Sequence, residues 1–126
     1  MIDDYFRGLM KLVMESRIVA SHEIALERRD AESGYVRGDI YFVDGSRLHL
    51  REFVNAEFTV ERFTYAYHYQ KTDGSFVFRY DRTKHFPALP NFPHHKHVND
   101  ESNVESAAPP YLAIVLKEIE SLISIE

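Results

Sequence analysis

The sequence has no cysteine, no apolar run long enough to cross a bilayer and no excess of positive charge. Without cysteine, the chain cannot form disulfides, Cys-ligated zinc sites or a Cys nucleophile. Its apolar stretches are shorter than the ~20 residues of a membrane-spanning helix, so we expect no membrane association. Asp3 and Asp4 make the N-terminus a poor secretory signal. These absences fit a cytoplasmic protein.

The charge of the chain is acidic overall but uneven along the sequence. The formal net charge of −5 at pH 7 makes the whole chain a poor non-specific binder of nucleic acid. Residues 79–97 carry four basic residues against one acidic residue, whereas residues 99–126 carry six acidic residues against one lysine. The basic segment could hold a phosphate backbone, and the acidic tail could shield that segment or bind a basic partner.

The length of 126 residues indicates a single domain that spans residues 1–126. The 44% hydrophobic content is enough for a core. Apolar residues three and four positions apart predict one helix over 2–14 and a second after Pro109-Pro110. The acidic segment 99–108 is predicted to be a flexible linker before the second helix.

The middle of the chain has the pattern of successive strands. Runs of branched and aromatic residues predict about five of them, over 17–30, 35–43, 47–53, 60–71 and 75–81. Asp44-Gly45 and Asp73-Gly74 are typical of tight hairpins. With no helix pattern between them, the strands predict an antiparallel meander. The fold class is therefore α+β, with an N-terminal helix, this sheet, a proline-rich extended arm and a C-terminal helix, the two helices covering one face of the sheet.

The last hairpin allows a register to be predicted. If Asp73-Gly74 forms a two-residue loop, His68 lies opposite Arg79 and Tyr67 lies opposite Tyr80. One side of the sheet then carries six aromatic residues: Tyr65, Tyr67, Tyr69, Phe76, Phe78 and Tyr80. We interpret them as core, with a base-stacking platform as the alternative. The other side carries Arg62, His68, Gln70, Arg79 and Asp81, either as a solvated face or as proton-transfer and anion-binding groups.

Glu52 interrupts an otherwise apolar side of its strand. An unpaired buried charge is costly, so Glu52 needs a partner. If Asp44-Gly45 sets the preceding hairpin as a two-residue loop, the opposing residue is Arg37, and we expect a structural ion pair.

Residues 85–97 hold four of the seven histidines and three of the five prolines. The prolines recur every three residues, which is the period of a polyproline II helix. A straight arm of this kind would hold His85 roughly 28 Å from His94, too far to share one metal ion. We therefore expect His94, His95 and His97 to act together, or with His68.

Three uses of these histidines remain open. A zinc site needs three or four convergent ligands, but the spacing matches no strong zinc signature. A metal-free phosphodiester-cleaving site needs a general base, a general acid and a cation, which these histidines, Lys96 and Arg79 could supply. A non-catalytic binding patch, or plain hydrogen-bonded histidines, is the third use.

Several segments together resemble the TumE toxin family of prokaryotic toxin–antitoxin systems. They are SRIVASHEI at 16–24, LHLREF at 48–53, VERFTYAYHYQ at 60–70, FRYD at 78–81 and FPHHKH at 92–97. The resemblance spans most of the chain and leaves out the acidic linker. It implies a small intracellular toxin that a partner antitoxin with a DNA-binding helix-turn-helix neutralises, and it transfers no active site.

Taken together, these features lead us to expect a toxin that is an endoribonuclease acting on cellular RNA without a metal or cofactor. The candidate catalytic residues are His68, Arg79, His94, His95, Lys96 and His97, and the candidate substrate-binding residues are Arg51, Arg62 and Arg82. The alternatives are a non-enzymatic RNA- or protein-binding module and a His-ligated metal-dependent hydrolase. Besides the antitoxin and RNA, a second copy of the chain is a candidate partner.

Overall fold

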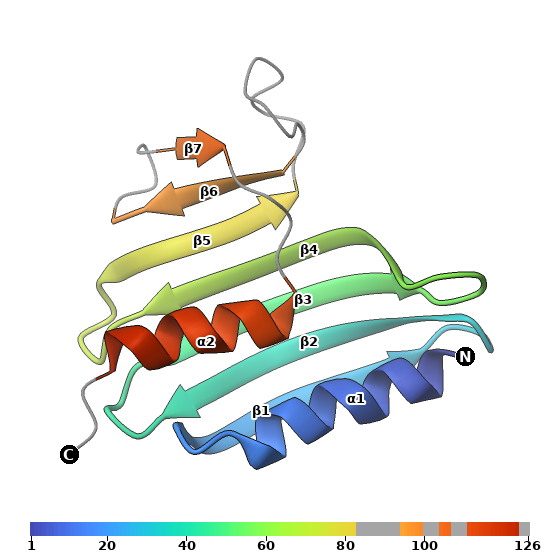
Figure 1. Ribbon diagram of the computed structural model, residues 1–126, viewed down its shortest axis with the longest axis horizontal. Helices are drawn as coiled ribbons and strands as arrows, with labels where there is room; N and C mark the ends of the chain where they lie inside the picture. The colour runs from blue at the N-terminus through green and yellow to red at the C-terminus, as the bar shows by residue number, and fades with distance from the viewer. Residues whose placement is uncertain (83–93, 100–103, 107–110, 124–126) are drawn as a thin grey trace.

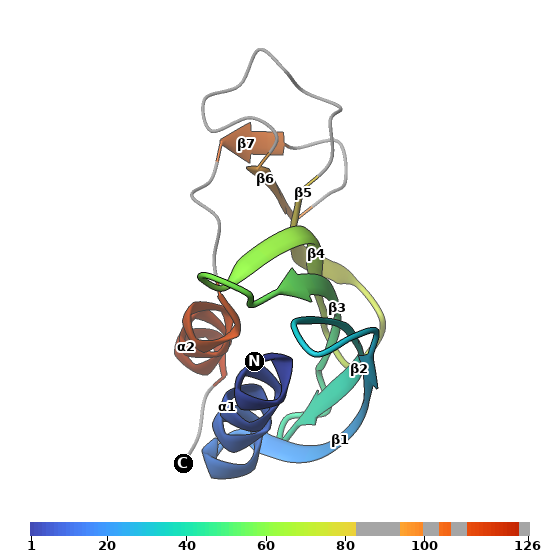
Figure 2. The same cartoon turned by 90° about the vertical axis from the view of Figure 1, so that its right-hand side faces the viewer.

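One antiparallel sheet, with two helices on the same face, makes up the molecule (Figures 1 and 2). The computed structural model describes residues 1–82, 94–99, 104–106 and 111–123. The elements are α1 (Ile2–Glu15), β1 (Val19–Arg28), β2 (Ser33–Phe42), β3 (Arg47–Asn55), β4 (Glu61–Gln70), β5 (Phe76–Arg82), β6 (His94–Val98), β7 (Val104–Ser106) and α2 (Leu112–Leu122). The strands lie in chain order, which confirms the predicted antiparallel meander.

The predicted number of about five strands is wrong. In the described residues, six strands have five residues or more, and the three-residue β7 follows them. The first five lie where the sequence places them. The backbone of β6 pairs with β5, with His94 opposite Arg82 and Val98 opposite Phe78, so the end of the predicted arm extends the sheet. β7 falls within the predicted linker 99–108, and the proline-rich segment 83–93 lies outside the described residues.

Both helices bury the apolar positions that their spacing predicts. α1 buries Ile2, Phe6, Leu9 and Val13, and α2 buries Leu112, Val115, Leu116 and Ile119. They cover alternate strand residues such as Leu48 and Leu50, which are fully buried. Each buried aliphatic side chain contributes about 1.5–3 kcal/mol, so this layer accounts for most of the driving force for the fold. Within the described chain, no helix is both long and apolar enough to cross a membrane.

The core interpretation of the aromatic side is confirmed for five of its six residues. Buried beneath the helices lie Tyr65, Tyr67, Tyr69, Phe78 and Tyr80. Phe76 is the exception, because β5 has a bulge that places it opposite Gln70. Its ring lies 5.1 Å from the ring of His68.

Both Asp-Gly hairpins have three-residue loops instead of two-residue loops. Phe42 N–H donates to Ser46 O across the first, and Lys71 N–H donates to Ser75 O across the second, each at 2.9 Å. Gly45 and Gly74 end these loops with φ of 86° and 84°, a conformation that favours glycine. In the second hairpin the bulge in β5 restores the predicted register, so His68 does lie opposite Arg79.

No such bulge corrects the first hairpin, and its register differs from the prediction by one residue. Val36 lies opposite Glu52, and Arg37 lies opposite Arg51. The predicted pairing of Glu52 with Arg37 is therefore wrong. The two side chains point to opposite faces of the sheet.

A second bulge, in β4, exchanges the faces of two residues. Phe53 lies opposite Thr64 whereas Val54 lies opposite Arg62, which leaves Phe63 as the extra residue. Arg62 therefore points toward the helices and is buried, and Phe63 is exposed on the other face. The prediction that Arg62 shares the polar face with His68 is wrong for this reason.

Candidate functional site

Both helices, α1 and α2, cover one face of the sheet, and the opposite face is called here the outer face (Figure 2). Along β3, Leu48, Leu50 and Glu52 are buried toward the helices. Successive side chains of a strand point to opposite faces, so His49, Arg51 and Phe53 lie on the outer face. Residues that oppose them in neighbouring strands lie there too.

One row across this face contains three histidines and an arginine. The register places Asp39 opposite His49, His49 opposite His68, His68 opposite Arg79 and Arg79 opposite His97. We call these five residues the histidine row. It crosses five strands, a width of about 19 Å at the usual strand spacing. The predicted companions His68, Arg79 and His97 are therefore brought together.

Arg79 is held by two buried neighbours at one end of the row. Its Nε donates to Asp81 Oδ2 at 2.9 Å, and its Nη2 lies 3.1 Å from His97 Nε2. A guanidinium only donates, so His97 Nε2 is the acceptor in this contact, which leaves the ring hydrogen on Nδ1. His97 is 4% exposed and Asp81 is 5% exposed, whereas Arg79 is only partly buried. This arrangement fixes the guanidinium at the edge of solvent.

His49 forms the more accessible pair of the row. Its Nδ1 lies 3.1 Å from Asp39 Oδ1, and its side chain is 42% exposed. An Nδ1–H that donates to Asp39 leaves Nε2 as a proton acceptor, which is how a carboxylate orients a general base. Arg47 Nε lies 3.8 Å from the same Asp39 oxygen and adds a second cation beside it.

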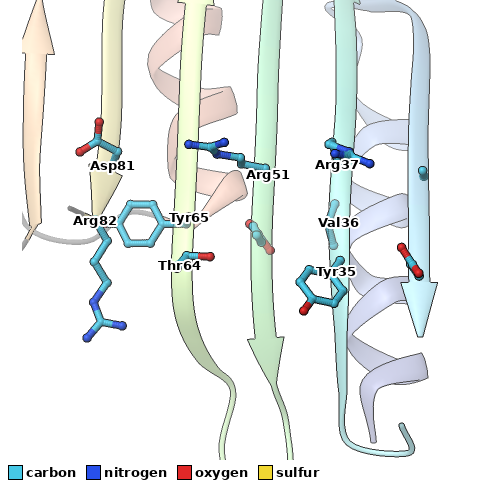
Figure 3. A pocket seen from close by; sticks show the side chains of 11 residues that line it. Tyr35, Val36, Arg37, Arg51, Thr64, Tyr65, Asp81 and Arg82 are labelled. Atoms are coloured by element: carbon cyan, nitrogen blue, oxygen red, sulfur yellow. The ribbon is translucent and has the colours of Figure 1, made fainter. Parts of the chain in front are cut away.

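A second row lies two residues further along the strands. The register places Arg37 opposite Arg51, Arg51 opposite Ala66 and Ala66 opposite Asp81. We call these four residues the arginine row; both arginines are exposed. A hollow of about 610 Å³ opens here, lined by Tyr35, Arg37, Arg51, Thr64, Asp81 and Arg82 among others (Figure 3). Its size falls within the ~300–1,000 Å³ of small-molecule sites.

Arg51 and Arg82 therefore occupy positions from which they could meet a ligand. Figure 3 shows both side chains beside the hollow, with the helices behind the sheet. Arg82 is also tied to β4, since its Nη1 donates to the backbone oxygens of Phe63 and Arg62 at 2.6 and 3.3 Å.

Lys96 does not join the other predicted site residues. It lies opposite Tyr80 and so points to the helix side, where its Nζ lies 3.1 Å from Glu118 of α2. Burial lowers the pKa of Lys96, but its contacts with Tyr80 and Glu118 outweigh burial, so the net pKa is raised. Lys96 thus fastens α2 to the sheet. The backbones of His94 and His95 belong to β6, and their side chains lie outside the described part of the structure.

Arg62 also lies on the helix side, in a buried polar cluster. Its Nη1 donates to the Tyr67 hydroxyl at 2.9 Å, and its guanidinium lies 4.0 Å from the ring centroid of Tyr111. The Tyr67 and Tyr5 hydroxyls both donate to Glu52, which is 2% exposed. Burial, followed by the Glu52 charge, raises the pKa of Tyr67 well above its usual value. Arg62 and Glu52 therefore serve the core.

Sequence reasoning missed His49, Asp39 and Arg37 as site candidates. His49 lies on the same side of the predicted third strand as the candidate Arg51, and this shared side could have identified His49 as a candidate. The assumed two-residue loop placed Arg37 opposite Glu52 and so hid the two rows. Among the described side chains, no group of three or more His, Asp or Glu residues is arranged to hold a metal ion.

A small α+β protein with a cation-lined sheet face is what these observations define. The family model described as Toxin TumE matches residues 9–124. The chain therefore belongs to the TumE toxin family, which gives it the role of a toxin and implies an antitoxin partner in general terms. No curated protein and no solved structure matches the chain.

Proposed function

We propose that this toxin is an endoribonuclease that cleaves cellular RNA by metal-independent acid–base chemistry on the outer face of its sheet. The histidine row carries the proposal. In this row His49 lies opposite His68 and His68 lies opposite Arg79, and this order supports roles for the two histidines in proton transfer. A general base, a general acid and a cation are the groups that phosphodiester cleavage needs.

The reaction can be written with these groups alone. His49 Nε2 takes the proton of a ribose 2′-hydroxyl, and that oxygen attacks the adjacent phosphorus. The bond from phosphorus to the 5′ oxygen breaks, and protonated His68 gives its proton to the departing oxygen. The products are a 2′,3′-cyclic phosphate and a 5′-hydroxyl, with no change in oxidation state.

Arg79 is assigned the phosphate, because its guanidinium is held in place and partly exposed. His97 is assigned the positioning of Arg79 instead of proton transfer, since its Nε2 already accepts from Arg79 and its side chain is buried. Arg51 and Arg82, which line the hollow, would bind RNA phosphates next to the one that is cleaved. Removing one positioned proton-transfer group typically costs about 10²–10⁴-fold in rate.

The partners follow from the same proposal. RNA is the substrate, and an antitoxin with a helix-turn-helix would neutralise the toxin. Self-association of the chain remains a further candidate. A module that binds RNA without cleaving it is the competing function, which the exposed arginines of the outer face also favour.

The test is incubation of purified toxin, freed of antitoxin, with cellular RNA in the presence and absence of chelator. We expect cleavage in both, with 2′,3′-cyclic phosphate ends. His49→Asn and His68→Asn should each lower the rate by about 10²-fold or more. The matched control is His22→Asn, because His22 lies opposite Ile40 on the helix side of β1.

Cleavage that chelator abolishes would overturn the metal-independent mechanism. Absence of cleavage in both arms, with toxicity in cells that survives His49→Asn and His68→Asn, would replace the enzyme with the binding module.

A further inference from the structure

Three aromatic rings gather at one end of the outer face, beside the arginine row. Tyr35 and Phe53 are stacked with centroids 4.7 Å apart and planes 14° apart, and the Phe63 ring lies 5.4 Å from Phe53. We call these three residues the aromatic patch. They come from three neighbouring strands, β2, β3 and β4.

The outer rings of the patch are exposed although they are apolar. Tyr35 is 43% exposed and Phe63 is 42% exposed. The bulge in β4 places Phe63 outward, against the alternation of the strand. Contacts among the rings hold their orientation, so a ring that stacked on them would meet a preformed surface.

Cations surround the patch. The Arg29 guanidinium lies 5.6 Å from the centroid of Phe53. Arg37 follows Tyr35 by two residues on β2, and Arg51 precedes Phe53 by two residues on β3, a separation of roughly 7 Å along each strand. Two carboxylates lie at this end, Glu27 on the edge strand β1, opposite Tyr35, and Glu61 on β4, opposite Asn55. Arg29, Arg37 and Arg51 beside the exposed rings favour an anionic ligand with flat, stackable groups.

We propose that the aromatic patch stacks an unpaired nucleobase of single-stranded RNA, while Arg37 and Arg51 bind the phosphate next to that base. The inference rests on the proposed function, since it names the form of RNA that this face accepts. Aromatic stacking combined with a cationic track is how proteins bind single strands with little sequence preference.

The order of features along the strands gives the path of the RNA across the sheet. The aromatic patch comes first, the arginine row second and the histidine row third. Four residues separate Phe53 from His49, about 13 Å along β3. A base on the patch therefore places the reacting phosphate one or two nucleotides away, at His49 and Arg79. Double-stranded RNA cannot present an unstacked base here.

The absence of tryptophan from the chain makes the proposal directly measurable. Phe63→Trp introduces a single tryptophan into the patch, and Met14→Trp, on the exposed side of α1, is the matched control. The probe is a short single-stranded oligoribonucleotide with every 2′-hydroxyl methylated, so that it cannot be cleaved. We expect it to quench the Phe63→Trp fluorescence to saturation and to leave Met14→Trp unchanged.

Two exposed positions test the energetics without risk to the core. Tyr35→Leu and Phe63→Leu should each weaken binding of the same probe by about 5- to 100-fold, the usual effect of losing one stacked base. A duplex of the same sequence should bind no better to wild type than to these variants.

Binding of the probe without quenching, or with an affinity that both leucine variants retain, would overturn the inference. So would quenching that rises with protein concentration alone, which would assign the patch to a second copy of the chain. Because the probe is uncleavable, quenching without activity on ordinary RNA would overturn only the proposed reaction. Cleavage without quenching would overturn only the stacking site.

Discussion

Lys96 and His97 are consecutive residues of β6, yet their side chains lie on opposite faces of the sheet. Lys96 binds Glu118 of α2, and His97 accepts from Arg79 on the outer face. The alternation of the strand separates two residues that the histidine-rich segment presents as a unit. One of them holds the fold together, and the other supports the candidate site.

Lys96→Met should therefore lower stability and leave RNA cleavage unchanged. The loss of one charge-assisted contact with Glu118 costs about 0.5–1.5 kcal/mol, measured as a lower urea midpoint at constant m value. Lys117→Met, at an exposed position of the same helix, should leave the midpoint unchanged. A Lys96→Met variant of full stability with no activity would return Lys96 to the active site.

The contribution of Lys96 should also depend on pH in a defined direction. Its pKa in the fold is raised above the ordinary value of 10.5. A raised pKa of a cationic group stabilises the fold below the unfolded-state value, and this stabilisation disappears as the pH rises through the folded-state value. The stability difference between wild type and Lys96→Met should be constant from pH 7 to 9 and shrink above pH 10.5. A difference that grows over that range would contradict the assignment.

Tyr67→Phe should destabilise the protein through the buried polar cluster. The substitution removes a donor to Glu52 and an acceptor for Arg62, and both partners are buried. Leaving buried polar groups short of a partner costs about 1–3 kcal/mol, and more when they are charged. Tyr41→Phe, half-buried on the other face of the sheet, is the control. Equal urea midpoints for the two variants would refute this role of Tyr67.

Two glycines should respond in opposite ways to alanine. A Cβ at Gly38 would lie 2.1 Å from the backbone oxygen of Glu23, which cannot rotate away, so β1 and β2 would have to separate. We expect Gly38→Ala to cost about 3 kcal/mol. A Cβ at Gly8 meets nothing within 4 Å, so Gly8→Ala should stabilise α1 by about 0.5–1 kcal/mol. Thermal melts of both variants check the pair, and a neutral Gly38→Ala would be inconsistent with this strand approach.

RNA affinity should depend on salt through the arginine row. Each phosphate contact to a single strand contributes about −0.7 to the slope of log K against log salt. Arg37→Gln and Arg51→Gln should each make the slope shallower by about that amount. Lys11→Gln, on the exposed side of α1, should leave the slope unchanged. Titrations of a single-stranded probe at several salt concentrations would decide this, and three identical slopes would exclude the arginine row as a phosphate site.

The sequence predicted both helices and the antiparallel meander, because each depends on strong periodicity. The pairing of His68 with Arg79 was predicted from a two-residue loop, and it holds because the bulge in β5 compensates for the extra loop residue. Sequence reasoning failed where one residue changes the phase of a strand. An Asp-Gly pair supports two- and three-residue loops alike, and the choice between them moved Arg37 from Glu52 to Arg51. A bulge leaves no mark in the alternation of apolar residues, so Arg62 was assigned to the wrong face.

The candidate site was predicted only in part for the same reason. His68 and Arg79 were paired from the last hairpin, whereas β6, the strand that pairs His97 with Arg79, was not predicted from the sequence. His49 and its partner Asp39 depend on the register of an earlier hairpin. Lys96 was grouped with His97 because adjacency in sequence was taken as adjacency in space, which a strand does not allow.

The extra residue in β4 has a consequence for how this protein tolerates change in length. Phe63 is the extra residue of the bulge, and it shifts the pairing of the first residues of β4 with β3 by one position. Deleting Phe63 would remove the bulge, while Arg62 stayed opposite Val54 on the helix side and every residue from Thr64 onward kept its partner. A shortened β4 would thus retain the histidine row and the buried Arg62 but lose one ring of the aromatic patch, so this deletion would separate RNA recognition from stability.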